Sequence, residues 1–165
     1  MESTDQNIAQ NINSIKEKIE NAVKESDKTN KATLVSVSKR VKKHLVQQAY
    51  DHGERHFGEN YFQSLKRRSE SLPSDIKWHF IGHLQSNKAK GLAEIKNLHV
   101  VETVDSLKLA GKLDKACAGL DKILNIFLQV LSSNEDNKSG LKPDEIMDVV
   151  DSIINNHKNL KLAGS

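Results

Sequence analysis

The chain has 165 residues, of which 36% are hydrophobic and 28% are charged, a composition typical of one soluble domain rich in helices. Its 25 basic and 22 acidic residues leave a net charge of +3, well short of the concentrated positive charge of a nucleic-acid-binding protein. No segment approaches the roughly 20 apolar residues of a membrane span, and the N-terminus lacks the basic and apolar stretches of a targeting signal. We therefore expect a cytoplasmic protein with no nucleic-acid partner and no membrane partner.

Helical and strand patterns alternate along the chain. Apolar residues spaced by three or four over residues 5–26 predict an amphipathic helix, and the β-branched run at residues 32–38 predicts the first strand. Further strands are predicted at residues 55–58, 77–81, 98–103 and 123–131, and from residue 160 onward. Further helices are predicted at residues 44–52, 61–71, 86–95, 106–118 and 143–156.

Six strands separated by helices predict a parallel sheet in an open or closed α/β fold. No glycine-rich G-x-G-x-x-G turn follows the first strand, which disfavours a dinucleotide-binding doubly wound sheet. A (β/α)8 barrel normally takes about 250 residues, so this chain would supply about three-quarters of one. Residues 1–165 contain no linker-like segment and are interpreted as a single domain. The one cysteine, Cys117, cannot form an internal disulfide and is expected to be a small buried side chain on a helix.

The sharpest candidate for chemistry is Lys39, which ends the first predicted strand. Parallel α/β folds place their functional sites at the carboxyl ends of the strands. A lysine that is desolvated there has a lowered pKa, and its neutral amine attacks an aldehyde to give a Schiff base. Position alone favours a solvent-exposed lysine instead, and the basic neighbours Arg40, Lys42 and Lys43 fit either interpretation.

Three other polar residues follow strands, and each has two interpretations. The amide of Asn60 either hydrogen-bonds a cofactor or caps the helix that follows, and the two roles are compatible. Ser86 and Asn87 either cap the next helix or offer free backbone N–H groups to an anion. For this pair, helix capping alone is the favoured interpretation.

The histidines give weaker signals. His79 lies between Trp78 and Phe80 on a predicted strand, so alternation directs it to the face opposite these aromatic side chains. It either contacts a ligand in a barrel interior or is a buried histidine with satisfied hydrogen bonds, and we favour the second. His83 lies in the following loop and is freer to contact a ligand. The seven histidines are scattered along the chain and it has no CxxC, so the sequence predicts no metal site.

Five segments, in order along the chain, carry a resemblance to a known family. They are VSVSK at residues 35–39, FGENY at 57–61, WHFIGHLQSNK at 78–88, ETVDS at 102–106 and NEDNKSGL at 134–141. These segments resemble the pyridoxal 5′-phosphate (PLP) homeostasis protein family. The third segment is highly specific, and the match extends over nearly the whole chain.

The resemblance implies a TIM-type (β/α)8 barrel similar to the N-terminal barrel of alanine racemase. It implies that Lys39 carries PLP as a Schiff base and that Asn60 lies at the PLP pocket. Lys138, which by position is a turn lysine, matches a loop lysine considered as a secondary PLP contact in the family. The implied function is intracellular PLP homeostasis without established catalysis: the family binds and buffers PLP and delivers it, with PLP-dependent apoenzymes as the expected recipients.

The sequence departs from the family pattern in two places. The family commonly follows its lysine with Thr-Lys-Pro, whereas Arg40, Val41 and Lys42 stand here. After residue 162 the family continues with two more strands, whose loops hold the PLP phosphate through backbone N–H groups. The resemblance therefore predicts a barrel C-terminally truncated to about six strands, with weak or absent PLP binding. We expect a monomer, and the open sheet edges make a dimer or an aggregate the alternative.

Two other functions are alternatives to that of a PLP carrier. A PLP-dependent amino-acid racemase-like enzyme needs a second base opposite the lysine, usually a tyrosine. The chain has only Tyr50 and Tyr61, both in helical settings. The basic run at residues 39–43 suggests a nucleic-acid-binding module, but aromatic residues make up 4% of the chain and no recognised motif is present. The PLP carrier is the favoured interpretation.

Overall fold

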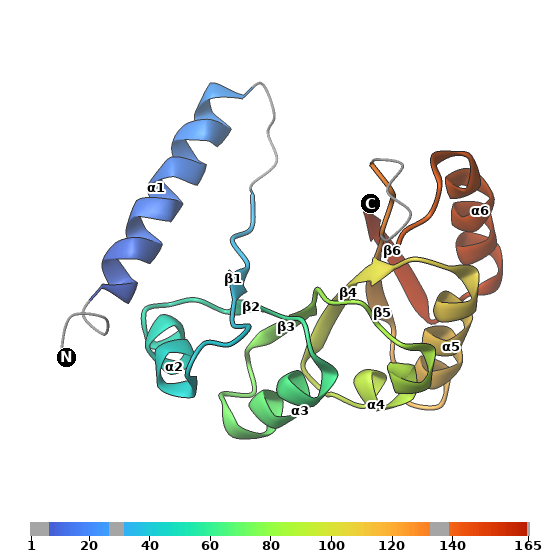
Figure 1. Ribbon diagram of the computed structural model, residues 1–165, viewed down its shortest axis with the longest axis horizontal. Helices are drawn as coiled ribbons and strands as arrows, with labels where there is room; N and C mark the ends of the chain where they lie inside the picture. Colours follow the sequence, from blue (N-terminus) through green and yellow to red (C-terminus); the bar gives the residue numbers. More distant parts are fainter. Residues whose placement is uncertain (1–6, 27–31, 133–138, 165) are drawn as a thin grey trace.

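Each strand pairs in parallel with the next strand along the chain, so the sheet follows the order β1 to β6 (Figure 1). The computed structural model describes residues 7–26, 32–132 and 139–164. The strands are β1 Ser36–Val37, β2 His56–Glu59, β3 Lys77–Phe80, β4 Leu98–Val104, β5 Leu124–Leu128 and β6 Leu160–Gly164. This sequential parallel order confirms the α/β fold expected for six consecutive units of a TIM-type barrel.

Helices connect the strands, as parallel pairing requires. The α-helices are α1 Ile8–Glu25, α2 Lys43–Asp51, α3 Phe62–Ser71, α4 Ala89–Ala93, α5 Leu107–Ala118 and α6 Ile146–Asn156, and the two 3-10 turns are η1 Ser86–Lys88 and η2 Pro143–Glu145. In Figure 1, helices α2 to α6 follow one another along one side of the curved sheet. All helices predicted from the sequence are therefore present, with small shifts at their ends.

Three boundaries differ from the sequence prediction. Residues 32–38 were expected to form a strand, but only Ser36 and Val37 pair with β2, since this strand has a partner on one side alone. The helix expected at residues 86–95 begins as the 3-10 turn η1. Strand β5 ends at Leu128 rather than at residue 131, and Val130 instead forms an isolated bridge with Leu141.

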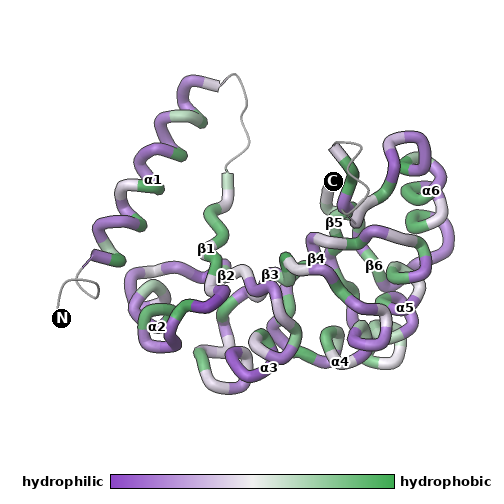
Figure 2. Tube along the Cα trace, in the orientation of Figure 1, coloured by the Kyte–Doolittle hydropathy of each residue, from purple (hydrophilic) through white to green (hydrophobic). Residues whose placement is uncertain are grey.

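The hydrophobic core lies between the sheet and its helices. The strands contribute Phe57, Trp78, Phe80 and Ile126, each at most 1% exposed. Helices α3, α4 and α5 contribute fully buried leucines to the same cluster, namely Leu65, Leu92, Leu109 and Leu113. In Figure 2 these helices alternate between apolar and polar stretches, as expected for helices with one face against a sheet. The helix-facing side of the sheet is therefore apolar, which leaves the other side for polar residues.

Helix α1 packs beside α2 rather than on the central strands. Ile12 supplies its buried contact, and His52 lies 2.8 Å from the side-chain oxygen of Asn13. Lys16 forms an ion pair with Glu54, whose side chain is 4% exposed. The ion pair offsets the cost of burying that carboxylate and attaches α1 to the segment that leads into β2.

Gly53 marks the end of α2, and the prediction of a buried Cys117 is confirmed. Gly53 follows α2 with a φ of +101°, a left-handed conformation that favours glycine at a helix end. Cys117 is completely buried on α5, where burial raises the pKa of its thiol. Among the described helices, none combines the length and the apolar composition needed to cross a membrane.

Removing core volume should destabilise the protein far more than removing the same atoms from the surface. We expect Leu113→Ala, at a fully buried position, to lower the free energy of unfolding by about 2–5 kcal/mol. The matched change Leu120→Ala, at a side chain that is 45% exposed, should cost roughly 1 kcal/mol or less. Urea denaturation followed by circular dichroism measures both, and equal losses would contradict the described core.

Candidate functional site

The carboxyl ends of β1 and β2 bring Lys39 beside the segment of Asn60 and Tyr61. The backbone N–H of Ser38 donates to the carbonyl of Gly58 at 2.8 Å, which continues the pairing of the two strands to their ends. The amine of Lys39 then lies 5.8 Å from the centre of the Tyr61 ring. Two of the residues selected from the sequence, Lys39 and Asn60, are therefore neighbours at one edge of the sheet.

Lys39 is exposed, so the described residues do not supply the desolvation that the sequence analysis considered. It begins the turn that separates β1 from α2, and the next residue, Arg40, has a φ of +59°. That left-handed conformation reverses the chain directly after the lysine. The turn holds the backbone of Lys39 at the sheet edge while its amine extends into solvent.

A buried carboxylate, Glu59, organises this edge. Its side chain is 1% exposed and lies at the end of β2, where its Oε2 atom is 3.2 Å from the Nε atom of Arg68. The hydroxyl of Ser38 donates to the same carboxylate at 3.3 Å and to the carbonyl of Gly58 at 3.0 Å. Arg68, on α3, also donates to the backbone carbonyls of Ser38 and Val41, at 3.1 and 2.6 Å. Glu59 and Arg68 together hold both ends of the Lys39 turn.

Sequence analysis did not identify Glu59 or Arg68. Glu59 lies in the FGENY segment, next to Asn60, and a charged residue that ends an apolar strand is a usable signal. Arg68 is one of two adjacent arginines on α3, and only the tertiary structure distinguishes it from the exposed Arg67.

The side chain of Asn60 is not engaged as a helix cap. Helix α3 is preceded by Tyr61, and no side chain caps it. The other carboxylate oxygen of Glu59 accepts instead from the backbone N–H groups of Asn60 and Tyr61, at 2.8 and 3.4 Å. Within residues 7–26, 32–132 and 139–164, the Asn60 amide has no hydrogen bond. It is free to bind a ligand, and the capping interpretation is wrong.

The loop after β3 lies against Asn60. A Cβ atom placed on Gly82 would come within 2.0 Å of the Asn60 carbonyl oxygen, so only glycine fits this approach. The hydroxyl of Thr103 donates to the Gly82 carbonyl at 2.6 Å and connects the end of β4 to the same place. These segments border a cleft of about 340 Å³, whose lining includes Asn60, Gly82, His83, Thr103 and Gln129. His83 is 60% exposed there, with its Nδ1 atom 3.4 Å from the Asp105 carboxylate.

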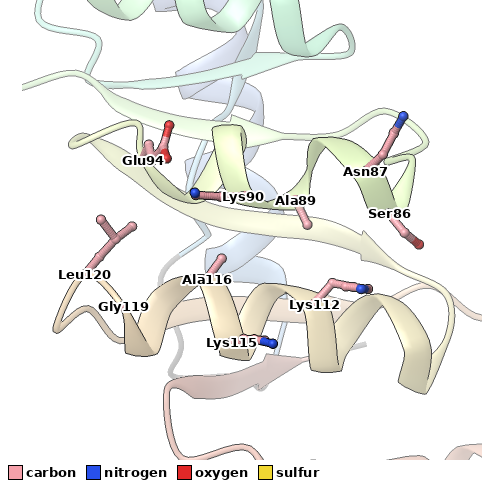
Figure 3. Close-up of a pocket in the computed structure, with 10 residues that line it drawn as sticks. All are labelled: Ser86, Asn87, Ala89, Lys90, Glu94, Lys112, Lys115, Ala116, Gly119 and Leu120. Carbon is pink, nitrogen blue, oxygen red and sulfur yellow. The ribbon is translucent and has the colours of Figure 1, made fainter.

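Ser86 and Asn87 do not lie at the edge that holds Lys39. Both line a pocket of about 570 Å³ between α4 and α5, together with Lys90, Lys112 and Lys115 (Figure 3). Neither residue caps a helix, because Gln85 precedes η1 and no side chain caps that turn. The favoured capping interpretation is therefore wrong for this pair, and the structure does not bring them together with Lys39. Lys138 lies outside the described residues.

His79 faces away from Trp78 and Phe80, as alternation predicted, and it is 6% exposed. Its Nδ1 atom lies 2.6 Å from the Glu102 carboxylate, and its Nε2 atom lies 2.8 Å from Nδ1 of His56. Both ring nitrogens therefore have partners within the protein, which agrees with the favoured interpretation of a buried, satisfied histidine.

A third histidine, His99, completes a cluster that sequence analysis missed. Its ring centre lies 5.3 Å from that of His56 and 5.3 Å from that of His79. Burial, and then the neighbouring His79 and Lys77, lower the pKa of His56 to about 4. Burial also lowers the pKa of His99. The signal in the sequence is one histidine near the start of each of three consecutive strands, β2, β3 and β4.

The chain is similar to known proteins over nearly its whole length. The family model of the alanine racemase N-terminal domain matches residues 5–165. Pyridoxal phosphate homeostasis proteins from Schizosaccharomyces pombe and Helicobacter pylori are each 38% identical, over 93% and 94% of this chain. The chain therefore has the alanine racemase N-terminal fold. It belongs to the pyridoxal phosphate homeostasis protein family.

A solved structure agrees with this assignment. PipY of Synechococcus elongatus, in a structure with PLP bound, has a TM-score of 0.77 and 27% identity, and the match covers 94% of this chain and 67% of PipY. The chain covers 64% of the Schizosaccharomyces pombe protein and 70% of the Helicobacter pylori protein. It covers 50% of the human relative. This sequence thus spans between half and about two thirds of the relatives it matches.

Removing Arg68 should leave Glu59 as a buried charge without its partner. We expect Arg68→Ala to lower the free energy of unfolding by about 3 kcal/mol. The adjacent change Arg67→Ala, at an exposed side chain, should stay within about 0.5 kcal/mol of the parent. Chemical denaturation of both variants tests this, and an Arg68→Ala protein as stable as Arg67→Ala would refute the role of the ion pair.

Proposed function

We propose that this protein binds PLP covalently through Lys39 and takes part in PLP homeostasis. The observation that carries the proposal is the position of the Lys39 amine, which the first turn presents at the sheet edge beside Tyr61 and the unpaired Asn60 amide. A primary amine, an aromatic ring and a free amide fit an aromatic aldehyde with polar ring substituents. The residues present are therefore suited to the cofactor.

The chemistry needs a neutral amine close to an aldehyde. Bound PLP supplies that aldehyde, whose carbon forms a Schiff base with the lysine nitrogen as water leaves. Tyr61 offers a flat surface beside the amine, and Asn60 offers a donor and an acceptor at its edge. His83 lines the cleft next to Asn60 and is also assigned to ligand contact. The hydrogen bonds of Glu59 and Arg68 hold the two strand ends in place.

The names of the relatives and the PLP bound in the PipY structure support this proposal. The relatives from Schizosaccharomyces pombe and Helicobacter pylori carry the name of PLP homeostasis proteins, and PipY has been solved with PLP bound. Because the chain spans only part of their length, their role is a proposal for it. Delivery of PLP to apoenzymes and the cytoplasmic location stay predictions, as do the contact at Lys138 and the weak binding expected from the sequence.

A racemase-like enzyme is the second candidate, and one contact favours it. Tyr61 is the only tyrosine beside Lys39, because the hydroxyl of Tyr50 donates to Asp75 at 2.6 Å in a different part of the molecule. Tyr61 is 52% exposed and would have to act as the second base. We favour the non-catalytic carrier. A catalytic base at Tyr61 needs a partner that holds its hydroxyl, and the described residues supply none.

Lys39→Ala should abolish covalent PLP binding. We expect the parent protein to shift the visible absorption of added PLP and to keep the cofactor on Lys39 after borohydride reduction, as peptide mass spectrometry detects. Lys43→Ala, a nearby exposed lysine on α2, should behave like the parent. An adduct that persists in Lys39→Ala, or a parent that gives no adduct at saturating PLP, would refute the assignment. The same titration measures how tightly PLP binds.

Alanine racemisation separates the two candidates. With PLP added, we expect no conversion of L-alanine to D-alanine by the parent protein, because no described group positions Tyr61 as a base. Turnover that Lys39→Ala and Tyr61→Phe each abolish would instead establish the racemase-like activity. Tyr50→Phe is the matched control, since it removes the other tyrosine hydroxyl.

A further inference from the structure

Three histidines meet on the face of the sheet that points away from the helices. They are His56 of β2, His79 of β3 and His99 of β4. Each offers a ring nitrogen, and these three atoms all lie within 4.8 Å of one another. The ring centres are 5.1 to 5.3 Å apart, so the three rings form a nearly regular triangle. We propose that this cluster is a binding site for a divalent transition metal ion, with Zn²⁺ as the ion that fits it best.

The donor set defines the class of ion. Imidazole nitrogens suit Zn²⁺, Cu²⁺ and Ni²⁺, whereas Mg²⁺ and Ca²⁺ require oxygen ligands. Three protein ligands leave a fourth tetrahedral position for water or another small ligand, as in open zinc sites. The fit requires only small movements. Zn–N bonds of about 2.0–2.1 Å place tetrahedral nitrogens roughly 3.3 Å apart. The His56 and His79 nitrogens are 2.8 Å apart, and all three nitrogens lie within 4.8 Å of one another.

Glu102 is the second observation that points to a metal. Its carboxylate lies 2.6 Å from Nδ1 of His79, so that nitrogen carries the proton and Nε2 presents its lone pair to the centre of the cluster. A carboxylate behind a ligating histidine fixes the ring and makes the other nitrogen more basic, which is a recurrent feature of zinc sites. In this role Glu102 is a positioning residue and does not bind the ion itself.

An irregularity in β4 makes this arrangement possible. His99 and Glu102 are three residues apart, and regular alternation would direct them to opposite faces of the sheet. The register between β3 and β4 shifts at this point, where Trp78 pairs with Leu98 but His79 pairs with Val100. The shift brings both side chains to His79. The side-chain amide of Asn125 donates to the backbone carbonyl of His99 at 3.1 Å and fixes the irregular segment from the other side.

The electrostatic surroundings are compatible with a cation. Glu102 contributes a negative charge at hydrogen-bond distance from the cluster, while Lys77 contributes a positive charge near His56 and His99. None of the three histidines is among the residues proposed to bind PLP. His56 begins β2, and His79 pairs with Gly58, two residues before Asn60.

Zinc titration of the untagged, chelator-treated protein tests the proposal. The titration is done without PLP, whose phosphate itself binds Zn²⁺, and a chromophoric chelator reports the competition. We expect one Zn²⁺ per chain and a higher thermal-unfolding midpoint in its presence. Glu102→Gln, which keeps an oxygen acceptor but removes the charge, should lower the affinity by about 10- to 100-fold. Glu102→Ala should lower it further, and His99→Gln should lower it more than either.

Two controls and one independent measurement make the result decisive. His52→Gln, at a histidine that contacts Asn13 outside the cluster, should bind Zn²⁺ like the parent, and so should Lys39→Ala. Circular dichroism in EDTA establishes that each variant is folded. If His99→Gln does not fold, X-ray absorption at the zinc edge of the parent decides: three histidine nitrogens support the site, and fewer overturn it. Zinc binding that is absent in the parent, or unchanged in a folded His99→Gln, also overturns it.

Discussion

The buried ion pair between Glu59 and Arg68 is the constraint on which the candidate PLP site depends. Burying a carboxylate is costly, and here the cost is offset by four partners: a guanidinium, a hydroxyl and two backbone N–H groups. Those partners come from the end of β1, the end of β2 and helix α3. One side chain therefore fixes the relative positions of the turn that holds Lys39 and the segment that holds Asn60.

This ion pair positions Lys39 without desolvating it. The amine extends into solvent beside Tyr61. The described residues act mainly by holding the amine where a ligand can meet it, which lowers the entropic cost of bringing the two together. An exposed lysine suits a protein that binds and releases an aldehyde better than one that must remove a proton from a bound substrate. This agrees with the carrier role, and the name of the family to which the chain belongs points the same way.

The same sheet carries two polar regions with different chemistry. At the carboxyl ends of the strands, an amine and a free amide face solvent and suit an organic ligand. Along β2, β3 and β4, three imidazoles and a carboxylate face one another and suit a metal ion. Parallel strands produce both arrangements, because neighbouring strands bring together residues that are far apart in the sequence.

The sequence by itself determined the fold class and the approximate place of the residues proposed to bind PLP. Alternating strand and helix patterns predicted a parallel α/β sheet, because hydrophobic periodicity is a local property. The VSVSK and FGENY segments indicated Lys39 and Asn60 through their resemblance to a family. Alternation around His79 also predicted its face correctly, since a regular strand places neighbouring side chains on opposite sides.

Only the tertiary structure decided which polar residues act together. It chose Arg68 over Arg67 as the partner of Glu59, and it separated Ser86 and Asn87 from the edge where Lys39 lies. It also joined His99 and Glu102 through a register shift that alternation cannot anticipate. The reason is physical: periodicity is set by neighbours along the chain, whereas an ion pair or a ligand cluster is set by contacts between different strands and helices.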